Sequence, residues 1–259
     1  MAMKTLKADW ATFTQGDFTI ENNVWNKGSL VNGNDYTQTI SFDKTDINHE
    51  LTFAWNWPST SHILAYPEIE AGYKPWSENG SDALTARLSQ ISTFDATFDY
   101  AMSGATSLYN VGFDMWLTKL PGADSGSITT EVSVWTHHGN INVDGKKVGT
   151  YQDGAFRANI YEEKHYGHPG ANQSWDYITV VAKKDMTSGT LDMDHLFDTL
   201  VGMKLVKPSA YFNGYEFGAQ LLGGKGSLTI HDIEHDFSTG SSHASDMAAQ
   251  AHHADAFLF

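Results

Sequence analysis

Short runs in which apolar and polar residues alternate dominate this chain of 259 residues. Alternate side chains of a strand point to opposite faces of a sheet, so this period predicts β-strands with one face in a core. Turn sequences such as Asn32-Gly33-Asn34 and Asp144-Gly145 separate the runs. The clearest predicted strands are residues 50–57, 96–102, 109–117, 129–135, 177–182 and 227–237.

Helical periodicity is confined to residues 191–201, where Leu196 and Leu200 repeat at helical spacing and Thr190 is placed to cap the first turn. Many closely spaced strands without regularly alternating helices favour an antiparallel fold over a parallel α/β one. The predicted fold class is therefore all-β: a jelly-roll sandwich of two antiparallel sheets, with one short helix and an open substrate cleft.

The composition favours a folded and strongly acidic protein. Hydrophobic residues make up 41% of the chain, and 31 acidic residues outnumber 16 basic ones, for a formal charge of -15. This charge repels nucleic acid and anionic membranes, so we expect a neutral or cationic partner and neither nucleic-acid nor membrane binding. The chain has no cysteine, which excludes disulfides and thiolate metal sites. No apolar run is long enough to span a bilayer.

Two predicted strands bring acidic and aromatic residues to one face. In residues 109–117 the apolar positions alternate with Asp114 and Trp116, and in residues 129–135 they alternate with Glu131 and Trp135. If the strands are neighbours, these four side chains share the face away from the core. Sugar rings stack on aromatic side chains, and glycosidic cleavage needs two carboxyl groups. The alternative is that these acids are simply solvated.

A second acidic position is Glu216, in the stretch Tyr211-Phe212-Asn213-Gly214-Tyr215-Glu216-Phe217-Gly218. Burial against the flanking aromatic residues would disfavour its charged form and raise its pKa, as a general acid requires. The alternative is an edge-strand glutamate that faces water. Two further aromatic groups fit a sugar site: the pair Trp55 and Trp57, which share one strand face, and Trp25 in a polar stretch.

Several segments, in this order, resemble glycoside hydrolase family 12, a group of endoglucanases and xyloglucanases with a β-jelly-roll fold. They cover roughly residues 20–235 and are Asn22-Asn23-Val24-Trp25, Trp55-Asn56-Trp57, Ile63-Leu64-Ala65-Tyr66-Pro67-Glu68, residues 109–117, Glu131-Val132-Ser133-Val134-Trp135 and Gly214-Tyr215-Glu216-Phe217.

The resemblance implies a role for each matching residue. Glu131 stands at the family's nucleophile position, Glu216 at its acid/base position, and Asp114 at that of the aspartate which supports the nucleophile. We expect Asp114 to share a hydrogen bond or a proton with Glu131. Ser133 replaces a methionine that is usual beside the nucleophile. The positions that match sugar-binding residues of the cleft are Asn23, Trp25, Tyr66 and Trp135.

The expected function is that of a retaining endo-β-1,4-glucanase, with a neutral β-glucan as partner, a monomeric state and no cofactor. The alternatives are a xyloglucan-specific endoglucanase and, in another class, a non-catalytic carbohydrate-binding jelly roll. We expect no metal site: the adjacent pairs His137-His138 and His252-His253 diverge on a strand, and His165 and His168 lack a convincing third ligand.

The composition changes after Phe237, which suggests a catalytic domain over residues 1–238 and a tail over residues 239–259. The first ten residues lack the apolar stretch of an ordinary signal peptide. The end of the tail, Asp255 to Phe259, resembles the C-terminal signals of type I exported proteins, an acid followed by apolar residues. We therefore expect a secreted protein that leaves the cell without a signal peptide; a disordered apolar end is the simpler alternative.

Overall fold

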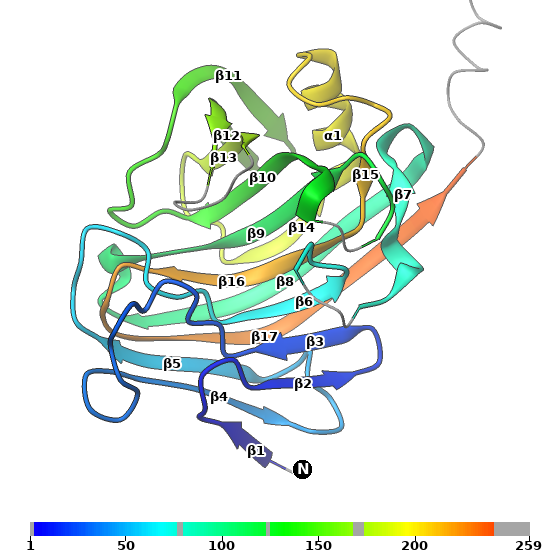
Figure 1. The fold of residues 1–259 in the computed structure, drawn as a ribbon. Helices are drawn as coiled ribbons and strands as arrows, with labels where there is room; N and C mark the ends of the chain where they lie inside the picture. Colours follow the sequence, from blue (N-terminus) through cyan, green and yellow to red (C-terminus); the bar gives the residue numbers. More distant parts are fainter. Residues whose placement is uncertain (1–2, 77–79, 123–124, 168–173, 241–259) are drawn as a thin grey trace, which may run out of the picture.

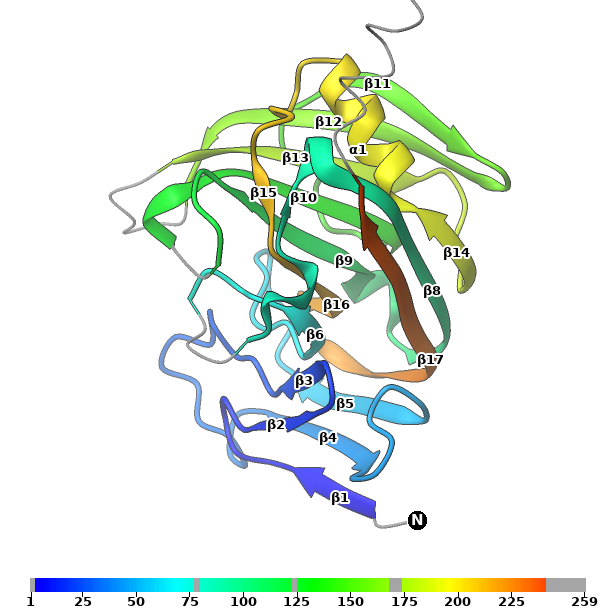
Figure 2. The ribbon, with the colours of Figure 1, turned by 90° about the vertical axis from the view of Figure 1, so that its right-hand side faces the viewer.

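The computed structural model describes residues 3–76, 80–122, 125–167 and 174–240. Two sheets lie face to face, as Figures 1 and 2 show from two directions, so the predicted all-β sandwich is confirmed. In spatial order, the smaller sheet contains six strands: β1 (Met3–Leu6), β4 (Thr37–Asp43), β5 (Leu51–Trp57), β17 (Gly224–Thr239), β8 (Ile91–Gly104) and β14 (Ser188–Asp192).

The larger sheet has a central path of nine strands. In spatial order they are β11 (Lys146–Asp153), β12 (Phe156–Tyr166), β13 (Trp175–Ala182), β10 (Ile128–His137), β9 (Tyr109–Thr118), β16 (Gly214–Leu221), β6 (Glu68–Gly72), β3 (Phe18–Glu21) and β2 (Thr12–Gln15). The short strand β15 (Tyr211–Phe212) joins β9 to β7 (Ala86–Arg87) beside this path. Neighbours are antiparallel, except that β10 and β13 run parallel.

The strand neighbours that matter most are β9 and β10, whose pairing the sequence analysis left as a condition and which do pair. Residues between Thr118 and Ile128 return the chain antiparallel, and Val132 lies opposite Met115. The core side of β9 is fully buried by the other sheet, through Val111, Phe113 and Met115. Its other side therefore faces away from the core, which leaves that side available for polar groups.

The core between the sheets is largely aromatic. The ring of Phe98 on β8 lies 5.8 Å from that of Phe113 on β9 and 5.8 Å from that of Phe217 on β16. The Phe113 and Phe217 rings are 4.6 Å apart. Phe94 continues the cluster toward Phe212. Ring pairs at such distances add to the hydrophobic gain from burying them, so this cluster binds the two sheets together.

The helix α1 (Met193–Gly202) lies at one end of the sandwich, opposite the end that carries β1 (Figures 1 and 2). The sequence predicted its apolar face, and Leu196 and Leu200 are buried. The predicted cap was wrong: Thr190 belongs to β14, and the Asp192 side chain accepts the hydrogen bond from the His195 backbone N–H. An acceptor at this position satisfies an N–H that the helix leaves unpaired.

Short 3₁₀ turns complete the described structure, at Asp82–Leu84, Leu88–Gln90, Thr106–Leu108 and Ser125–Ser127. Among the described residues, no helix combines the length and the apolar character that crossing a bilayer requires.

The pair Trp55 and Trp57 does not contribute to the polar face, contrary to the sequence-based expectation. Both are buried in β5, in the smaller sheet. Trp57 stacks on Tyr36 with ring centres 3.5 Å apart and donates to Gln38, while Trp55 packs edge-on against Tyr109. They share a face, as predicted, but that face is the core.

We predict that Phe98→Ala lowers the free energy of unfolding by about 3–5 kcal/mol, because it removes a ring that contacts both sheets. The matched control is Thr97→Ala on the exposed face of β8, which loses only the hydroxyl contact with Thr190 and about 1 kcal/mol. Urea denaturation measures both. Equal losses would contradict the assignment of Phe98 to the core between the sheets.

Candidate active site

Three carboxyl groups project from the face of the larger sheet that points away from the core. Asp114 on β9 lies directly opposite Ser133 of β10 on one side and Glu216 of β16 on the other. Glu131 is two residues before Ser133 and so points to the same face. Strand pairing therefore gathers residues that lie far apart in the sequence.

The register also sets the separation of Glu131 and Glu216. These are backbone separations. The two strands are two strand spacings apart, about 9.5 Å, and the backbone of Glu131 is displaced by two residues along its strand, about 6.6 Å. Asp114 occupies the strand between them. All three side chains are nearly buried: 7% of Glu131, 5% of Glu216 and 4% of Asp114 is exposed.

Glu131 has one strong donor. The Trp175 indole N–H donates to its Oε2 at 2.8 Å, and Tyr177 lies opposite it on β13. Burial raises the pKa of Glu131 to about 8, although the Trp175 hydrogen bond lowers it and the charge of Asp144 raises it. The indole N–H thus favours the ionised form that burial disfavours.

Asp114 is held by two neighbours. Its Oδ1 accepts from the Ser133 hydroxyl at 2.6 Å, and its Oδ2 accepts from the Gln220 amide at 3.5 Å. Ser133 in turn accepts from the Tyr177 hydroxyl at 3.0 Å. Burial raises the pKa of Asp114 well above its usual range, and the charge of Glu131 raises it further.

We expected Asp114 to share a hydrogen bond or a proton with Glu131. Among the described residues Asp114 instead accepts hydrogen bonds from Ser133 and Gln220. Ser133 lies directly opposite Asp114, two residues after Glu131 on β10, and its hydroxyl donates to Asp114. Asp114 and Glu131 therefore interact through their charges, which disfavour simultaneous ionisation. The smaller serine makes this arrangement possible because a methionine at position 133 has no hydroxyl to donate.

Glu216 lies among further charged groups. Glu70 on β6 is directly opposite it, and the Lys74 Nζ lies 3.8 Å from its Oε1. Burial raises the pKa of Glu216 well above its usual range; Lys74 counteracts this rise and Asp114 adds to it. The prediction from sequence was that burial would raise this pKa, and the structure agrees in direction and cause.

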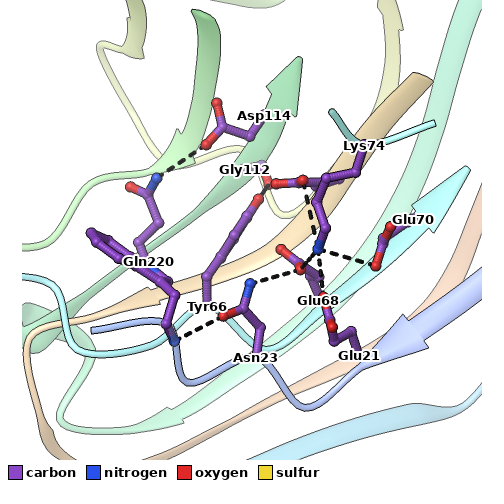
Figure 3. Close-up of polar contacts among 11 residues, drawn as sticks. Glu21, Asn23, Tyr66, Glu68, Glu70, Lys74, Gly112, Asp114 and Gln220 are labelled. Atoms are coloured by element: carbon purple, nitrogen blue, oxygen red, sulfur yellow. Dashed lines mark hydrogen bonds and ion pairs between the residues drawn. The ribbon is translucent and has the colours of Figure 1, made fainter. Parts of the chain in front are cut away.

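The four predicted sugar-binding residues differ in their surroundings. Asn23 donates to Glu68 at 3.0 Å and accepts from the Trp25 backbone N–H (Figure 3). The Tyr66 hydroxyl donates to the carbonyl oxygen of Gly112 on β9, the strand of Asp114, at 3.1 Å. Trp25 is 39% exposed. Asn23 thus contacts Glu68, and Tyr66 contacts the strand of Asp114.

Trp135 follows Ser133 on the same face of β10, and it is buried in a small apolar cluster with Ile141, Val181 and Leu222. Its indole N–H has no hydrogen-bond partner among the described residues.

A second aromatic group was not recognised from the sequence as a unit. The ring of Trp76 lies 4.6 Å from that of Trp116 and 6.5 Å from that of Trp175, and the Trp116 and Trp175 rings are 5.4 Å apart. Trp76 is 54% exposed. These indoles therefore form an aromatic wall beside Glu131, with Trp76 as its exposed edge.

Sequence reasoning missed three residues that act on the carboxyl groups: Trp175, Tyr177 and Lys74. Trp175 and Tyr177 begin β13, and their alternation with the core residue Ile178 could have placed them on the polar face. That inference would also have required the parallel pairing of β10 with β13, for which the sequence carried no signal. Lys74 lies in an irregular segment after β6, where no periodicity applies.

Two groups of described residues have a geometry that could hold a metal ion: His49, Asp232 and Glu234, and the set Glu21, Glu68 and Glu70. The first lies at the partly exposed surface, where His49 pairs with Asp46 and Asp232. The second already surrounds the Lys74 ammonium. Of the pair His165 and His168, the second lies outside the described residues.

Two surface hollows lie away from the carboxyl groups. One of about 420 Å³ is lined by residues of β4, β5 and β17 such as Thr39 and Lys225, and one of about 240 Å³ is lined by Arg87 and Lys207. Neither is lined by a carboxylate, so the polar face around Asp114 is the candidate for acid–base chemistry.

Comparison of the sequence with models of protein families identifies the family of this chain. The model of glycosyl hydrolase family 12 matches residues 16–238, most of the chain. The chain belongs to glycosyl hydrolase family 12. It is therefore a glycoside hydrolase, as the resemblance implied.

Curated relatives of this family 12 chain are distant but extend over most of its length. The xyloglucan-specific endo-β-1,4-glucanase 1 of Phytophthora nicotianae is 22% identical over 227 residues, 86% of each chain. The xyloglucan-specific endo-β-1,4-glucanase A of Emericella nidulans is 23% identical over 226 residues, 85% of this chain and 86% of the relative.

Solved structures support the fold of this family 12 chain. The family 12 xyloglucanase from Bacillus licheniformis matches with a TM-score of 0.79 at 24% identity. The match covers 91% of this chain and 100% of the xyloglucanase chain. An endoglucanase from Rhodothermus marinus has a TM-score of 0.75 at 19% identity, over 92% and 100% of the two chains.

Burial of Glu131 predicts a pH-dependent cost to stability. Its folded-state pKa of about 8 exceeds the ordinary value near 4.3, so the folded state holds a proton that the unfolded state releases between these pH values. Stability contributed by this group is therefore lost as pH rises from about 4.3 to 8.

We predict a change with pH in the unfolding free energy of Glu131→Gln minus that of the wild type. This difference should be at least about 1 kcal/mol larger at pH 8 than at pH 5, because glutamine cannot ionise. Urea denaturation at the two pH values measures this difference. Asp99→Asn, at an exposed position on β8, is the control and should show no such gain. A constant difference between Glu131→Gln and the wild type would contradict the buried, proton-retaining state of Glu131.

Proposed function

We propose that this chain is a retaining endo-β-1,4-glucanase in which Glu131 is the nucleophile and Glu216 the acid/base. The observation that carries the proposal is the placement of the two glutamates on strands that flank Asp114, on one nearly buried face. Two carboxyl groups on either side of one bond are what glycoside hydrolysis requires, and retention requires them about 5–5.5 Å apart.

In the first step Glu216, protonated, donates its proton to the glycosidic oxygen of the leaving sugar. Glu131, ionised, attacks the anomeric carbon, and a covalent glycosyl-enzyme forms as the C–O bond to the leaving group breaks. The burial that raises the pKa of Glu216 supports its role as the proton donor.

In the second step water attacks the anomeric carbon from the side of the departed sugar. Glu216, now ionised, takes a proton from this water, and the bond to Glu131 breaks. Two inversions leave the β-configuration unchanged. In each step both glutamates change charge in opposite senses: Glu216 loses a proton as Glu131 becomes a neutral ester, and the reverse follows in the second step. The neighbouring groups must therefore accommodate both states of each glutamate.

The neighbours of Glu131 suit the nucleophile's role. Ionised Glu131 is stabilised by the Trp175 N–H, and a protonated Asp114 would spare it a second negative charge nearby. Ser133 and Tyr177 hold Asp114 in place through their hydroxyl groups. These contacts together support an attack by Glu131.

The substrate we propose is a neutral β-1,4-glucan. The aromatic wall of Trp76, Trp116 and Trp175 offers surfaces on which sugar rings can stack. The curated relatives named above act on xyloglucan according to their names, which favours xyloglucan as the second candidate substrate. Initial rates on barley β-glucan, carboxymethylcellulose and xyloglucan, measured side by side, decide between these polymers.

We also propose that the protein acts outside the cell as a monomer. Support for export comes from the C-terminal pattern of Asp255 to Phe259, which lies outside the described residues. Expression with and without residues 239–259, followed by measurement of activity in medium and cells, tests whether this segment directs export. Size-exclusion chromatography tests the monomeric state.

We predict that Glu131→Gln and Glu216→Gln each reduce glucan hydrolysis at least about a hundredfold, because each removes a carboxyl group from the reaction. Reducing-sugar release measures the rate, and NMR of the first product measures its configuration, which should be β. Glu50→Gln is the control and should retain wild-type activity. The Glu50 side chain is 73% exposed and directly precedes β5 of the smaller sheet.

Two outcomes would contradict this proposal. Cleavage that persists in both glutamate variants would exclude their roles. A wild type that binds oligosaccharides without cleaving any of the polymers would indicate the non-catalytic carbohydrate-binding alternative.

We further predict that Trp175→Phe shifts the acidic limb of the pH profile of kcat/KM to higher pH. Loss of the indole N–H destabilises ionised Glu131, so its pKa rises and a higher pH is needed to form the nucleophile. Trp10→Phe, at an exposed position, is the control. An unchanged acidic limb would show that the hydrogen bond does not influence the ionisation that controls attack.

A further inference from the structure

Lys74 places a single cation within a group of four glutamates. It follows β6, and its Nζ lies 2.5 Å from Glu21, 2.6 Å from Glu68, 3.3 Å from Glu70 and 3.8 Å from Glu216. Figure 3 shows the ammonium surrounded by carboxyl groups from β3 and β6. Only 11% of the lysine side chain is exposed.

The ammonium remains charged in this position. Burial by itself would lower the pKa of Lys74, but the surrounding carboxylates outweigh burial and hold this pKa well above its usual range. A buried charge that is paired and hydrogen-bonded is tolerated, whereas an unpaired one is costly. Lys74 therefore serves as a permanent positive charge beneath the acid/base.

The hydrogen bonds of Lys74 are distributed unevenly among the glutamates. A lysine ammonium has three N–H donors, and the three recorded hydrogen bonds go to Glu21, Glu68 and Glu70. Glu216 Oε1, at 3.8 Å, has no hydrogen-bond partner among the described residues. Lys74 thus attracts Glu216 by charge and leaves this oxygen without a hydrogen bond from the described residues.

The three other glutamates act as an anchor for the lysine. Glu68 accepts from both Lys74 and Asn23 through the same oxygen, Oε1. Glu21 lies opposite Glu68 on the neighbouring strand, and Glu70 points to the same face two residues further along. Their strands are rigid parts of the larger sheet, so the ammonium is held at a defined position relative to Glu216.

We propose that Lys74 is a positioning residue for the acid/base, a role that rests on the proposed function. Its charge holds the Glu216 carboxyl in place and stabilises the carboxylate that remains after Glu216 has given its proton to the leaving group. That carboxylate must persist in a nearly buried site until water arrives. Lys74 thereby stabilises the ionised form of Glu216 between the first step and the second.

The ionisation of Glu216 responds to every charged group that faces it. Asp114 from β9, Glu70 from β6 and Glu21 from β3 raise its pKa by repulsion, whereas Lys74 lowers it. The charges of Glu68 and Glu216 also repel each other, which raises the pKa of Glu68. Removing the lysine and removing one of the glutamates should therefore move the pKa of Glu216 in opposite directions.

The test compares Lys74→Met with Glu70→Gln. Without the ammonium the pKa of Glu216 rises, so the basic limb of kcat/KM moves to higher pH by about one unit or more, the usual effect of a charge within 4–6 Å. Glu70→Gln removes repulsion, and the same limb moves to lower pH. Lys74→Arg retains the charge and should restore a limb close to that of the wild type.

A titration of the Glu216 carboxyl by ¹³C NMR, assigned with Glu216→Gln, provides a readout that does not depend on turnover. It should show the same opposite shifts. A general loss of structure would instead lower activity at every pH, without opposite displacements of the profile. If Lys74→Met does not fold, Lys74→Gln, which also removes the charge, takes its place and is judged by the same criteria.

Opposite shifts in both the kinetic profile and the titration support the inference. An unchanged basic limb in a folded Lys74→Met or Glu70→Gln variant overturns it, whether or not the titration moves. Failure of the proposed function is recognised separately and first, as a wild type that cleaves none of the β-glucans, and the positioning role then falls with it.

Discussion

The structure depends on placing three carboxyl groups on one nearly buried face of a sheet. Asp114, Glu131 and Glu216 lose most of their hydration there, and burial is the largest cause of the raised pKa of each. Few donors offset this cost: the Trp175 N–H for Glu131, the Ser133 hydroxyl for Asp114 and the Lys74 charge for Glu216. Since each acid has a different neighbour, chemically similar groups can hold different protonation states, as catalysis by two carboxyl groups requires.

The larger sheet separates packing from chemistry. One face of β9, β10 and β16 closes the aromatic core, where Phe113 and Phe217 contact Phe98 of the other sheet. The opposite face bears the carboxyl groups, at positions set by the strand register. Side chains carried by paired strands have little freedom to move relative to one another, so the core indirectly fixes the geometry of the reacting groups. Hydrogen bonds from Ser133 and Gln220 then orient Asp114 within that frame.

Period-two alternation predicted much of this arrangement because it is a local property of the strand. It placed Asp114 on the side of β9 away from Phe113, and Glu131 on the side of β10 away from Val132, and both assignments are confirmed. The same reasoning failed for Trp55 and Trp57. Alternation shows that two residues share a face, but which face is covered depends on the opposing sheet. The helix prediction was correct in its apolar face but wrong in its cap. Thr190 belongs to strand β14, and Asp192 caps the helix.

The amino-acid sequence by itself determined the all-β class, the strands that carry Glu131, Asp114 and Glu216, and the membership of family 12, since alternation and motif order are encoded locally along the chain. Tertiary structure alone decided which groups surround each acid. Trp175 reaches Glu131 through the parallel pairing of β10 with β13, and Lys74 reaches Glu216 from an irregular segment more than a hundred residues earlier. Such contacts depend on strand order and register, which arise when the whole sheet assembles and which no short stretch of sequence specifies.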